Sequence, residues 1–268
     1  MFLRTVSRGA LAALLVSAVP AIGVTPALAA TPAASIATPA DFGSPVYPKR
    51  GRYLLVDAAS ARLFMVEDGQ VVDSMKVIVG KPGAQTPTIS SKIYYATLNP
   101  YWNVPADLAR TIIAPRVLKD GVSYLREHNY EVLASFEDGA PEIAPEEVDW
   151  KAVAAGREKV KIRQLPGPGN SMGQVKFGFP NNYSIFLHDT PKKDLFEADE
   201  RALSNGCVRL EDAPRLARWL LGQDPQMVAA PGIPEQHVAL PRAVPIYITY
   251  LDQPTELAFA GGGTPLTR

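Results

Sequence analysis

The alternation of apolar and polar residues along the chain predicts a domain built mainly from short β-strands. The predicted strands are runs rich in Val, Ile, Leu, Tyr and Phe, at residues 53–57, 61–67, 70–79, 93–97, 175–179, 183–187 and 246–250. Asp68-Gly69 lies between the second and third runs and is a strong hairpin signal. Pro180-Asn181-Asn182 separates two later runs and predicts a second hairpin. Because hairpins join antiparallel strands, we expect a mostly antiparallel sheet.

Helical patterns are fewer than strand patterns. The three predicted helices cover residues 107–119, 123–128 and 213–221. The last has the clearest limits, because Asp212 precedes it, Pro214 lies in its first turn and Gly222 follows its end. Many strands with a few helices predict a fold that is mainly β with some α structure (α+β).

The first residues predict an export signal. Arg4 and Arg8 form a positive region, residues 9–19 are apolar, and Ala27-Leu28-Ala29 is a cleavage signal. We therefore expect residues 1–29 to be a signal peptide that is removed on export. The alternative is an uncleaved membrane anchor, which the short apolar run disfavours because a bilayer span needs ~20 residues.

Composition divides the rest of the chain. Residues 30–50 are rich in Ala, Pro, Ser and Thr and are expected to form a flexible leader, and residues 253–268 are expected to form a tail. The folded domain is expected at residues 51–252. Within it, residues 104–169 carry charge, several Pro residues and a weak β pattern, and we interpret them as a partly helical, cap-like insertion. It is either a lid over the functional site or a decoration without a role in binding.

The charge balance argues against one class of partner. The chain has 27 Lys and Arg and 27 Asp and Glu, which gives a formal net charge of +0. Loss of Arg4 and Arg8 with the signal peptide leaves a slightly acidic protein. Because nucleic-acid binding depends on a basic surface, no nucleic-acid partner is expected.

The single cysteine, Cys207, is the most informative residue of the chain. An exported protein meets oxidising conditions, and one cysteine cannot form an intramolecular disulfide. His188 lies upstream at the end of a predicted strand. A thiol nucleophile paired with this histidine is therefore the leading interpretation. The imidazole is expected to lower the pKa of the thiol by forming an ion pair, and then to return the proton to the leaving amine.

The residues before Cys207 predict an oxyanion hole. A glycine directly before a nucleophile allows the backbone to turn so that N–H groups face the reacting carbonyl. The amides of Cys207 and Gly206 are the first candidates, and Asn205 is another.

Three other interpretations of these residues compete with catalysis. A lone cysteine is often only a small buried apolar residue. A zinc site made by His188, Asp189 and Cys207 would need a fourth ligand from a distant histidine without ligand-pair spacing. A serine nucleophile at Ser204 or Ser184 lacks the G-x-S-x-G elbow. We therefore expect neither a metal nor a cofactor.

Two runs, His188-Asp189-Thr190-Pro191 and Ser204-Asn205-Gly206-Cys207-Val208-Arg209, closely resemble the active-site signature of the YkuD-type L,D-transpeptidases. The family pattern is a histidine, a gap, and then [Ser/Thr]-x-Gly-Cys-[Ile/Val]-Arg. The resemblance extends over residues 53–251. Residues 99–105 and 166–170 resemble the larger periplasmic branch of the family, which has a capping insertion between these runs. The resemblance implies a mixed or antiparallel, β-sandwich-like catalytic domain with a cap.

The resemblance implies a peptidoglycan acyltransferase. Cys207 would attack the carbonyl between the third and fourth residues of a stem peptide, releasing D-alanine. The side-chain amine of a second stem would resolve the thioester and give a 3→3 cross-link. His188 would act as base and then acid, oriented by the backbone carbonyl of Asp189 or, less favoured, by its side chain. Peptidoglycan stem peptides are the expected substrates, and carbapenems are expected to acylate the thiol.

Four further residues are expected to bind substrate: Ser204, Arg209, Tyr101 and Trp102. Arg209 either binds a substrate carboxylate or braces the active-site loop. The two aromatic residues are expected to line the groove, with burial in the core as the alternative. The expected location is the periplasm, in association with the cell wall, and the expected state is a monomer.

The chain also departs from the family pattern. Asn205 stands where many members have histidine. The large branch usually carries an N-terminal scaffold and a peptidoglycan-binding module, and residues 31–52 are too few for either, so a nearly bare catalytic domain with a cap is expected. Two alternatives to transpeptidation stay open. One is hydrolysis at the same site, by an L,D-carboxypeptidase or an endopeptidase. The other is a non-catalytic wall-binding scaffold, which the intact signature disfavours.

Overall fold

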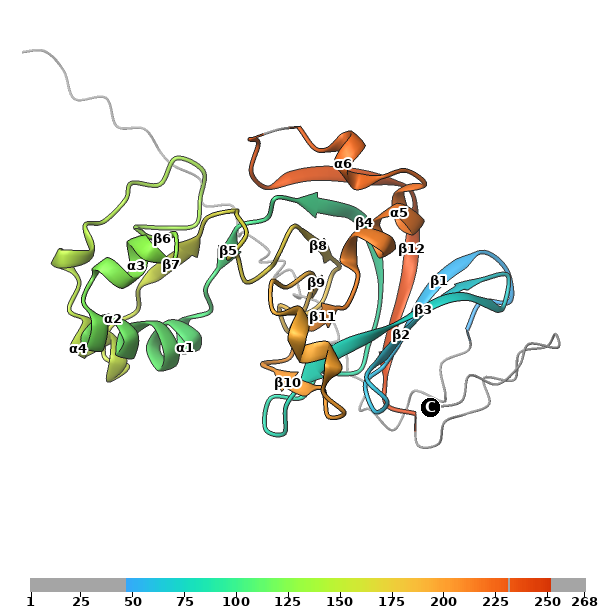
Figure 1. Cartoon of the computed structure of the whole chain (residues 1–268), viewed down its shortest axis with the longest axis horizontal. Helices are drawn as coiled ribbons and strands as arrows, with labels where there is room; N and C mark the ends of the chain where they lie inside the picture. The colour runs from blue at the N-terminus through green and yellow to red at the C-terminus, as the bar shows by residue number, and fades with distance from the viewer. Residues whose placement is uncertain (1–46, 231, 252–268) are drawn as a thin grey trace, which may run out of the picture. The chain divides into compact units, whose positions relative to one another are not determined.

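The structure is a computed structural model that describes residues 47–230 and 232–251 (Figure 1). The predicted signal peptide at 1–29, most of the leader at 30–50 and the tail at 253–268 lie outside these residues. No helix within the described ranges has both the length and the apolar character needed to span a bilayer.

A mixed sheet of nine strands forms the main part of the described chain. Its strands are β1 (Arg52–Asp57), β2 (Arg62–Glu67), β3 (Gln70–Gly80), β4 (Ile89–Leu98), β8 (Val175–Gly178), β9 (Leu187–His188), β10 (Ala202–Ser204), β11 (Val208–Leu210) and β12 (Gln236–Thr249). Their order is β10-β3-β11-β9-β8-β4-β12-β1-β2, and β2 also pairs with β3. The sheet therefore closes on itself. The fold is mainly β with a few helices, as predicted.

Most neighbouring strands are antiparallel, and three pairs are parallel. β1 pairs with β12, β10 with β3, and β11 with β9 in parallel register. The predicted hairpin at Asp68-Gly69 is present between β2 and β3, and Asp68 takes a positive φ of 48° that the turn requires. The parallel pairs matter for function, because one of them lies directly at the predicted nucleophile.

The core lies inside the closed sheet and beneath one helix. α5 (Ala213–Leu221) has the limits that the sequence predicts. The Asp212 carboxylate caps it by accepting a hydrogen bond from the Arg215 amide, and Gly222 ends it in the left-handed region. Its face formed by Leu216 and Leu220 packs against the apolar side of the sheet. Each such buried leucine contributes about 1.5–3 kcal/mol to folding.

The second predicted hairpin is only partly correct. β8 and β9 pair antiparallel, but residues 183–186 are not a strand, and the connection is a longer loop. The side chain of Asn181 explains this, because its amide donates to the carbonyls of Phe179 and Ile185 and its oxygen accepts from the Ile185 amide. These contacts replace the hydrogen bonds of a strand. Ser184 has a positive φ of 55°, which also interrupts extended structure.

Two other segments differ from prediction in detail. The helical run expected at 107–119 comprises α1 (Ala106–Leu108), a π-turn η2 (Ala109–Ile113) and α2 (Ala114–Asp120). β12 begins at Gln236, well before the predicted residue 246, because it pairs along most of β4. Short helical segments η4 (Lys193–Glu197) and α6 (Pro225–Val228) complete the main part.

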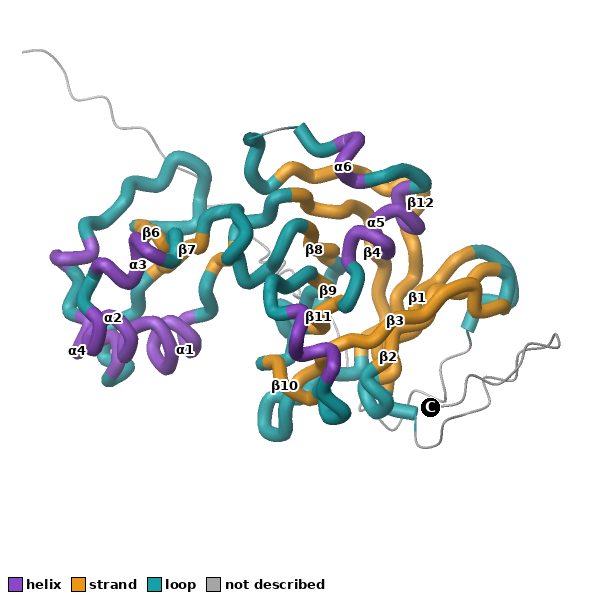
Figure 2. The backbone as a smooth tube through the Cα atoms, in the orientation of Figure 1, coloured by secondary structure: helices purple, strands orange, loops and turns teal. Residues whose placement is uncertain are grey.

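The predicted insertion has its own secondary structure and its own core. A three-stranded sheet combines β5 (Trp102–Asn103), β7 (Lys161–Gln164) and β6 (Tyr130–Leu133). Figure 2 shows β6 and β7 near the helices α1, α2, α3 (Ser123–Glu127) and α4 (Trp150–Ala154), and η3 (Pro145–Glu147) precedes α4. Ile113, Leu125 and Ile162 are fully buried within this core. The small sheet is more β structure than the weak pattern of 104–169 predicts.

Candidate active site

The register of two parallel strands brings the predicted catalytic residues together. In β9 and β11, Leu187 pairs with Val208 and His188 pairs with Arg209. Leu187 and Val208 are fully buried in the core. Because side chains alternate between the two faces of a sheet, His188 and Arg209 lie on the opposite face. Cys207 directly precedes β11, and the same alternation places it on the face of Arg209.

The loop that carries Cys207 is held by the Ser204 hydroxyl. This hydroxyl donates to the Cys207 carbonyl over 2.6 Å and accepts from the Gly206 amide over 3.1 Å. Gly206 has a φ of 116°, which side chains other than hydrogen rarely allow. Ser204 is buried, so it shapes the nucleophile loop. The Gly206 amide, an expected oxyanion donor, is turned to Ser204 in this conformation, and its role stays a prediction.

The histidine ring is fixed by the next residue in the chain. His188 Nδ1 lies 2.5 Å from the Asp189 carbonyl, the group that the sequence suggested as its orienting partner. A carbonyl oxygen only accepts hydrogen bonds, so Nδ1 carries the proton and donates. Nε2 is then the basic nitrogen and the one available for proton transfer. Whether this contact serves catalysis stays a prediction.

The Asp189 carboxylate has other partners. Its Oδ2 accepts from the Gln174 amide over 2.9 Å, and its Oδ1 lies 2.7 Å from Lys193 Nζ. Lys193 also donates to the carbonyls of Leu210, the last residue of β11, and of Glu211, which follows it. The side chain therefore anchors the segment after His188, and the backbone carbonyl is the group that contacts the imidazole.

The electrostatics of the resting site differ from the expected ion pair. Burial is the main cause that lowers the pKa of His188 to about 4, and Arg209 and Lys176 lower it further. Burial also raises the pKa of the Cys207 thiol above its ordinary value, and the Phe186 backbone and Arg209 offset this only in part. Both groups are therefore neutral near pH 7, because burial penalises their charged forms more than their neighbours stabilise them.

The contacts of the thiol agree with a neutral resting state. Cys207 Sγ donates to the Ser184 carbonyl over 3.8 Å, on the loop between β8 and β9. Among the described residues, no hydrogen bond joins Cys207 to His188. In this conformation the thiol therefore donates its proton to Ser184 and not to the imidazole, and sequence reasoning had no signal for this contact.

Two cationic side chains flank His188 on the same face of the sheet. Lys176 lies opposite His188 in β8, and its Nζ is 2.5 Å from Glu235 Oε1, so its charge is paired. Arg209 lies opposite His188 in β11. Within the described part of the chain, its guanidinium has no carboxylate partner and no hydrogen bond. Arg209 is therefore an unpaired positive charge two residues after the predicted nucleophile.

Tyr101 and Trp102 do not join this constellation. The guanidinium of Arg163 lies over the Tyr101 ring at 4.2 Å, and Trp102 lies 6.3 Å from the ring of Tyr130. In residues 47–230 and 232–251, neither aromatic residue has a ring contact or hydrogen bond with Cys207 or His188. Both belong to the edge of the insertion, so their predicted role in substrate binding has no support from these contacts.

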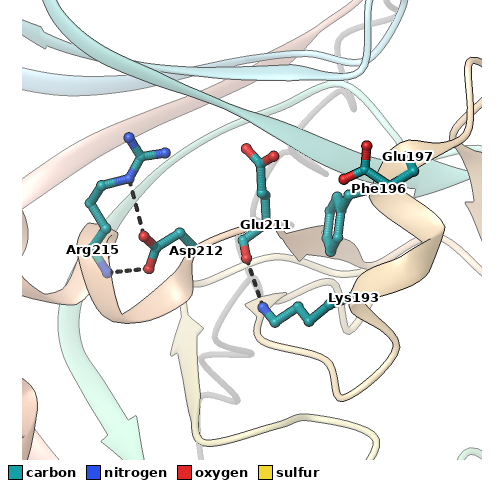
Figure 3. A pocket seen from close by; sticks show the side chains of 6 residues that line it. All are labelled: Lys193, Phe196, Glu197, Glu211, Asp212 and Arg215. Carbon is teal, nitrogen blue, oxygen red and sulfur yellow. Dashed lines mark hydrogen bonds and ion pairs between the residues drawn. The ribbon is translucent and has the colours of Figure 1, made fainter.

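Two surface hollows lie near the loops of the site. The first has a volume of about 530 Å³. Figure 3 shows the residues that line it: Lys193, Phe196, Glu197, Glu211, Asp212 and Arg215. Both of its cations are paired, since Arg215 Nε is 3.4 Å from Asp212 and Lys193 Nζ is 2.7 Å from Asp189. A second hollow of about 360 Å³ is lined by Thr88, Ile89, Ser90, Pro180, Asn181, Asn182 and Tyr183. It contains no charged residue and adjoins the loop that carries Ser184.

Metal chemistry finds no support in the described residues. They contain no group of three or more His, Cys, Asp and Glu side chains arranged to hold an ion. The arrangement instead fits acyl transfer, with a thiol, a basic imidazole nitrogen and an unpaired arginine on one face of a sheet.

Comparison with known proteins agrees with this chemistry. The YkuD family, described as the L,D-transpeptidase catalytic domain, matches residues 51–240. A candidate L,D-transpeptidase of Haemophilus influenzae is 34% identical over 176 residues, which are 66% of this chain and 35% of that protein. The chain thus spans about a third of the length of this curated relative. On the extent of the family match, the chain belongs to the YkuD family of L,D-transpeptidase catalytic domains.

Solved structures with partial similarity are also L,D-transpeptidases. One from Mycobacterium smegmatis has 14% identity and a TM-score of 0.35, over 74% of this chain and 58% of that one. L,D-transpeptidase 3 from Mycobacterium tuberculosis, solved with a faropenem-derived adduct, has 8% identity and a TM-score of 0.34, over 74% and 60% of the two chains. LdtMt1, solved with imipenem, has 12% identity and a TM-score of 0.35, over 74% and 59%.

The packing of Gly173 against Asp189 gives a first prediction. Gly173 has a φ of 63°, and a Cβ there would lie 2.3 Å from Asp189 Oδ2. Gly173→Ala should cost about 1–2 kcal/mol from backbone strain and about 1–3 kcal/mol more from the clash, measured by urea denaturation. Gly222→Ala is the matched control, because Gly222 has a φ of 74° and open space around it. Equal losses in the two variants would contradict the clash.

The neutral thiol gives a second prediction. The rate of Cys207 alkylation by iodoacetamide should rise with pH around a midpoint above ~8.5, the ordinary value for cysteine. Because Arg209 lowers the pKa of the thiol, Arg209→Met should move this midpoint higher still. A rate that is already at its plateau at pH 7 would instead indicate a preformed thiolate.

Proposed function

We propose that the protein is an exported cysteine acyltransferase that forms 3→3 cross-links in peptidoglycan. The observation that carries this proposal is the β9–β11 register, which places His188, Arg209 and the Cys207 loop on one face of the sheet. Family membership supports L,D-transpeptidase chemistry. The predicted signal peptide at 1–29 supports export to the periplasm and action at the cell wall.

In the proposed first step, Cys207 attacks the carbonyl between the third and fourth residues of a stem peptide. As the S–C bond forms, the thiol proton moves to His188 Nε2, which is free because Nδ1 donates to Asp189. The resulting oxyanion is stabilised by backbone N–H groups of the nucleophile loop. Collapse of this intermediate breaks the peptide C–N bond. D-alanine leaves with the proton from His188, and a thioester stays on Cys207.

In the proposed second step, the side-chain amine of a second stem attacks the thioester. His188 takes a proton from this amine and returns one to the departing sulfur, so that the free thiol is regenerated. The product is an amide between two diamino acids. Near pH 7 His188 Nε2 is unprotonated and can accept a proton, although a pKa of about 4 makes this imidazole a weaker base than one whose pKa lies near the working pH.

Arg209 is proposed to bind a carboxylate of the donor stem. Its guanidinium has no carboxylate partner among the described residues, and burial lowers its pKa, which indicates a charge held in a partly desolvated place. A substrate carboxylate would compensate this charge with two hydrogen bonds. This role is distinct from bracing the loop, for which Ser204 supplies the observed contacts.

The proposed reaction predicts a defined product. Disaccharide tetrapeptides incubated with the mature protein should yield dimers that have lost one D-alanine per link, detected by mass spectrometry. Cys207→Ala should abolish the product, and His188→Gln should reduce its rate by roughly 10²–10⁴. His128→Gln, at an exposed position, is the matched control. Tripeptide without dimer would identify a hydrolase, and unchanged substrate would favour the scaffold.

Carbapenem acylation is a separate prediction of the same nucleophile. Attack of Cys207 on the strained β-lactam carbonyl opens the ring and releases no group, so the protein should gain the full mass of imipenem. The adduct should be absent from Cys207→Ala and slower to form in His188→Gln, as measured by intact mass against time. An unmodified wild-type protein after prolonged incubation would contradict an acylating thiol.

A further inference from the structure

Thr86 lies beneath the nucleophile loop without being part of it. It belongs to the connection between β3 and β4 and is completely buried. Its Oγ1 accepts a hydrogen bond from the Gly80 amide over 2.9 Å and donates to the Gly206 carbonyl over 2.7 Å. Because the acceptor role is filled by Gly80, the hydroxyl proton is directed to Gly206. A single hydroxyl thus joins the end of β3 to the residue before Cys207.

The surroundings of Thr86 hold it firmly. The Tyr250 hydroxyl donates to the Thr86 carbonyl over 2.8 Å. Gly80 packs so closely that a Cβ on it would lie 2.5 Å from the Thr86 amide nitrogen. The Lys81 amide also donates to the Ser204 carbonyl over 2.9 Å, which attaches the same connection to the start of the nucleophile loop. The hydroxyl of Thr86 is therefore a fixed point.

The contact with Gly206 determines the direction of the Cys207 amide. A peptide unit is planar and, in trans, its C=O and the following N–H point in opposite directions. No peptide bond of the described chain is cis. With the Gly206 carbonyl turned to Thr86, the Cys207 N–H must point away from Thr86. In the described part of the chain this N–H has no hydrogen-bond partner, whereas the Gly206 N–H is used by Ser204.

The orientation of the Gly206–Cys207 peptide needs a stabilising contact, because Gly206 allows this peptide to rotate. Gly206 has a φ of 116° and no Cβ, so rotation of the Gly206–Cys207 peptide meets little steric resistance. Rotation would turn the Cys207 N–H inward and point the Gly206 carbonyl oxygen at the oxyanion. The negative charges of these two oxygens would then repel each other. The Thr86 hydrogen bond is the observed contact that opposes this rotation.

We propose that Thr86 is a positioning residue that orients the Cys207 N–H to stabilise the oxyanion formed when Cys207 is acylated. This inference rests on the proposed function for its biological meaning. The hydroxyl does not touch substrate and acts through the Gly206–Cys207 peptide. The proposal concerns only reactions that form a tetrahedral oxyanion, which separates it from a general role of Thr86 in folding.

The test compares two electrophiles on the same thiol. p-Nitrophenyl acetate reacts through a tetrahedral oxyanion, and iodoacetamide reacts by displacement without one. Thr86→Val removes the hydroxyl and keeps the shape, and Thr86→Ser keeps the hydroxyl. Thr97→Val is the matched control, because Thr97 is also completely buried and hydrogen-bonded, to His237. Thr86→Ala is a second hydroxyl-free variant in case Thr86→Val does not fold.

Thr86→Val should lower the rate with p-nitrophenyl acetate by roughly 10- to 100-fold, which is at or below the lower end of the effect of losing one oxyanion donor. Its rate with iodoacetamide should stay within about twofold of the wild-type rate. The pH midpoint of that reaction should not change. Thr86→Ser should restore the ester rate, and Thr97→Val should retain both rates.

Equal losses with both electrophiles would overturn the proposal, because they would indicate a general structural role. Unchanged ester reactivity in Thr86→Val, or in Thr86→Ala, would also overturn it. Both assays use the intrinsic reactivity of Cys207, so they do not depend on transpeptidation. A wild-type protein that forms no cross-linked product would refute the proposed function and leave this comparison decisive for Thr86.

Discussion

The parallel pairing of β9 with β11 is the constraint on which the site depends. It joins two segments that are separated in sequence, and its register sets which side chains share a face. Leu187 and Val208 bury their side chains in the core, and this burial fixes His188 and Arg209 on the other face. A slip of one residue would move Leu187 and Val208 out of the core and turn His188 and Arg209 into it. The burial of Leu187 and Val208 therefore also fixes the pairing of β9 with β11 that positions His188 and Arg209.

Much of the fold follows from local sequence signals, and most of the site contacts do not. α5 has its predicted limits because Asp212 and Gly222 are local capping signals. The loop at 183–186 escaped prediction because the Asn181 side chain overrides a β-rich run. Cys207 and His188 were identifiable from their motif. Thr86 was not, because nothing in its neighbourhood indicates a contact with Gly206, far away in sequence.

The charge state of the site shows why residue types alone mislead. A cysteine beside a histidine suggests an ion pair, but a pair forms only where the surroundings stabilise both charges. Here burial disfavours both ions, and the cations of Arg209 and Lys176 disfavour a charged imidazole further. The sequence identifies Cys207 and His188 as partners, whereas their degree of burial determines whether the thiol keeps its proton. Burial is a property of the whole fold.

The proton that Cys207 keeps has a consequence for its chemical survival. Peroxide and other oxidants attack the thiolate far more readily than the thiol. A protein outside the cytoplasm meets such oxidants without the thiol reductants that would reverse sulfenic acid formation. For the proposed exported enzyme, a thiol that stays protonated at rest would suffer less of this damage than a preformed thiolate. In that setting, the raised pKa of the Cys207 thiol and its contact with the Ser184 carbonyl would slow oxidation of the idle protein.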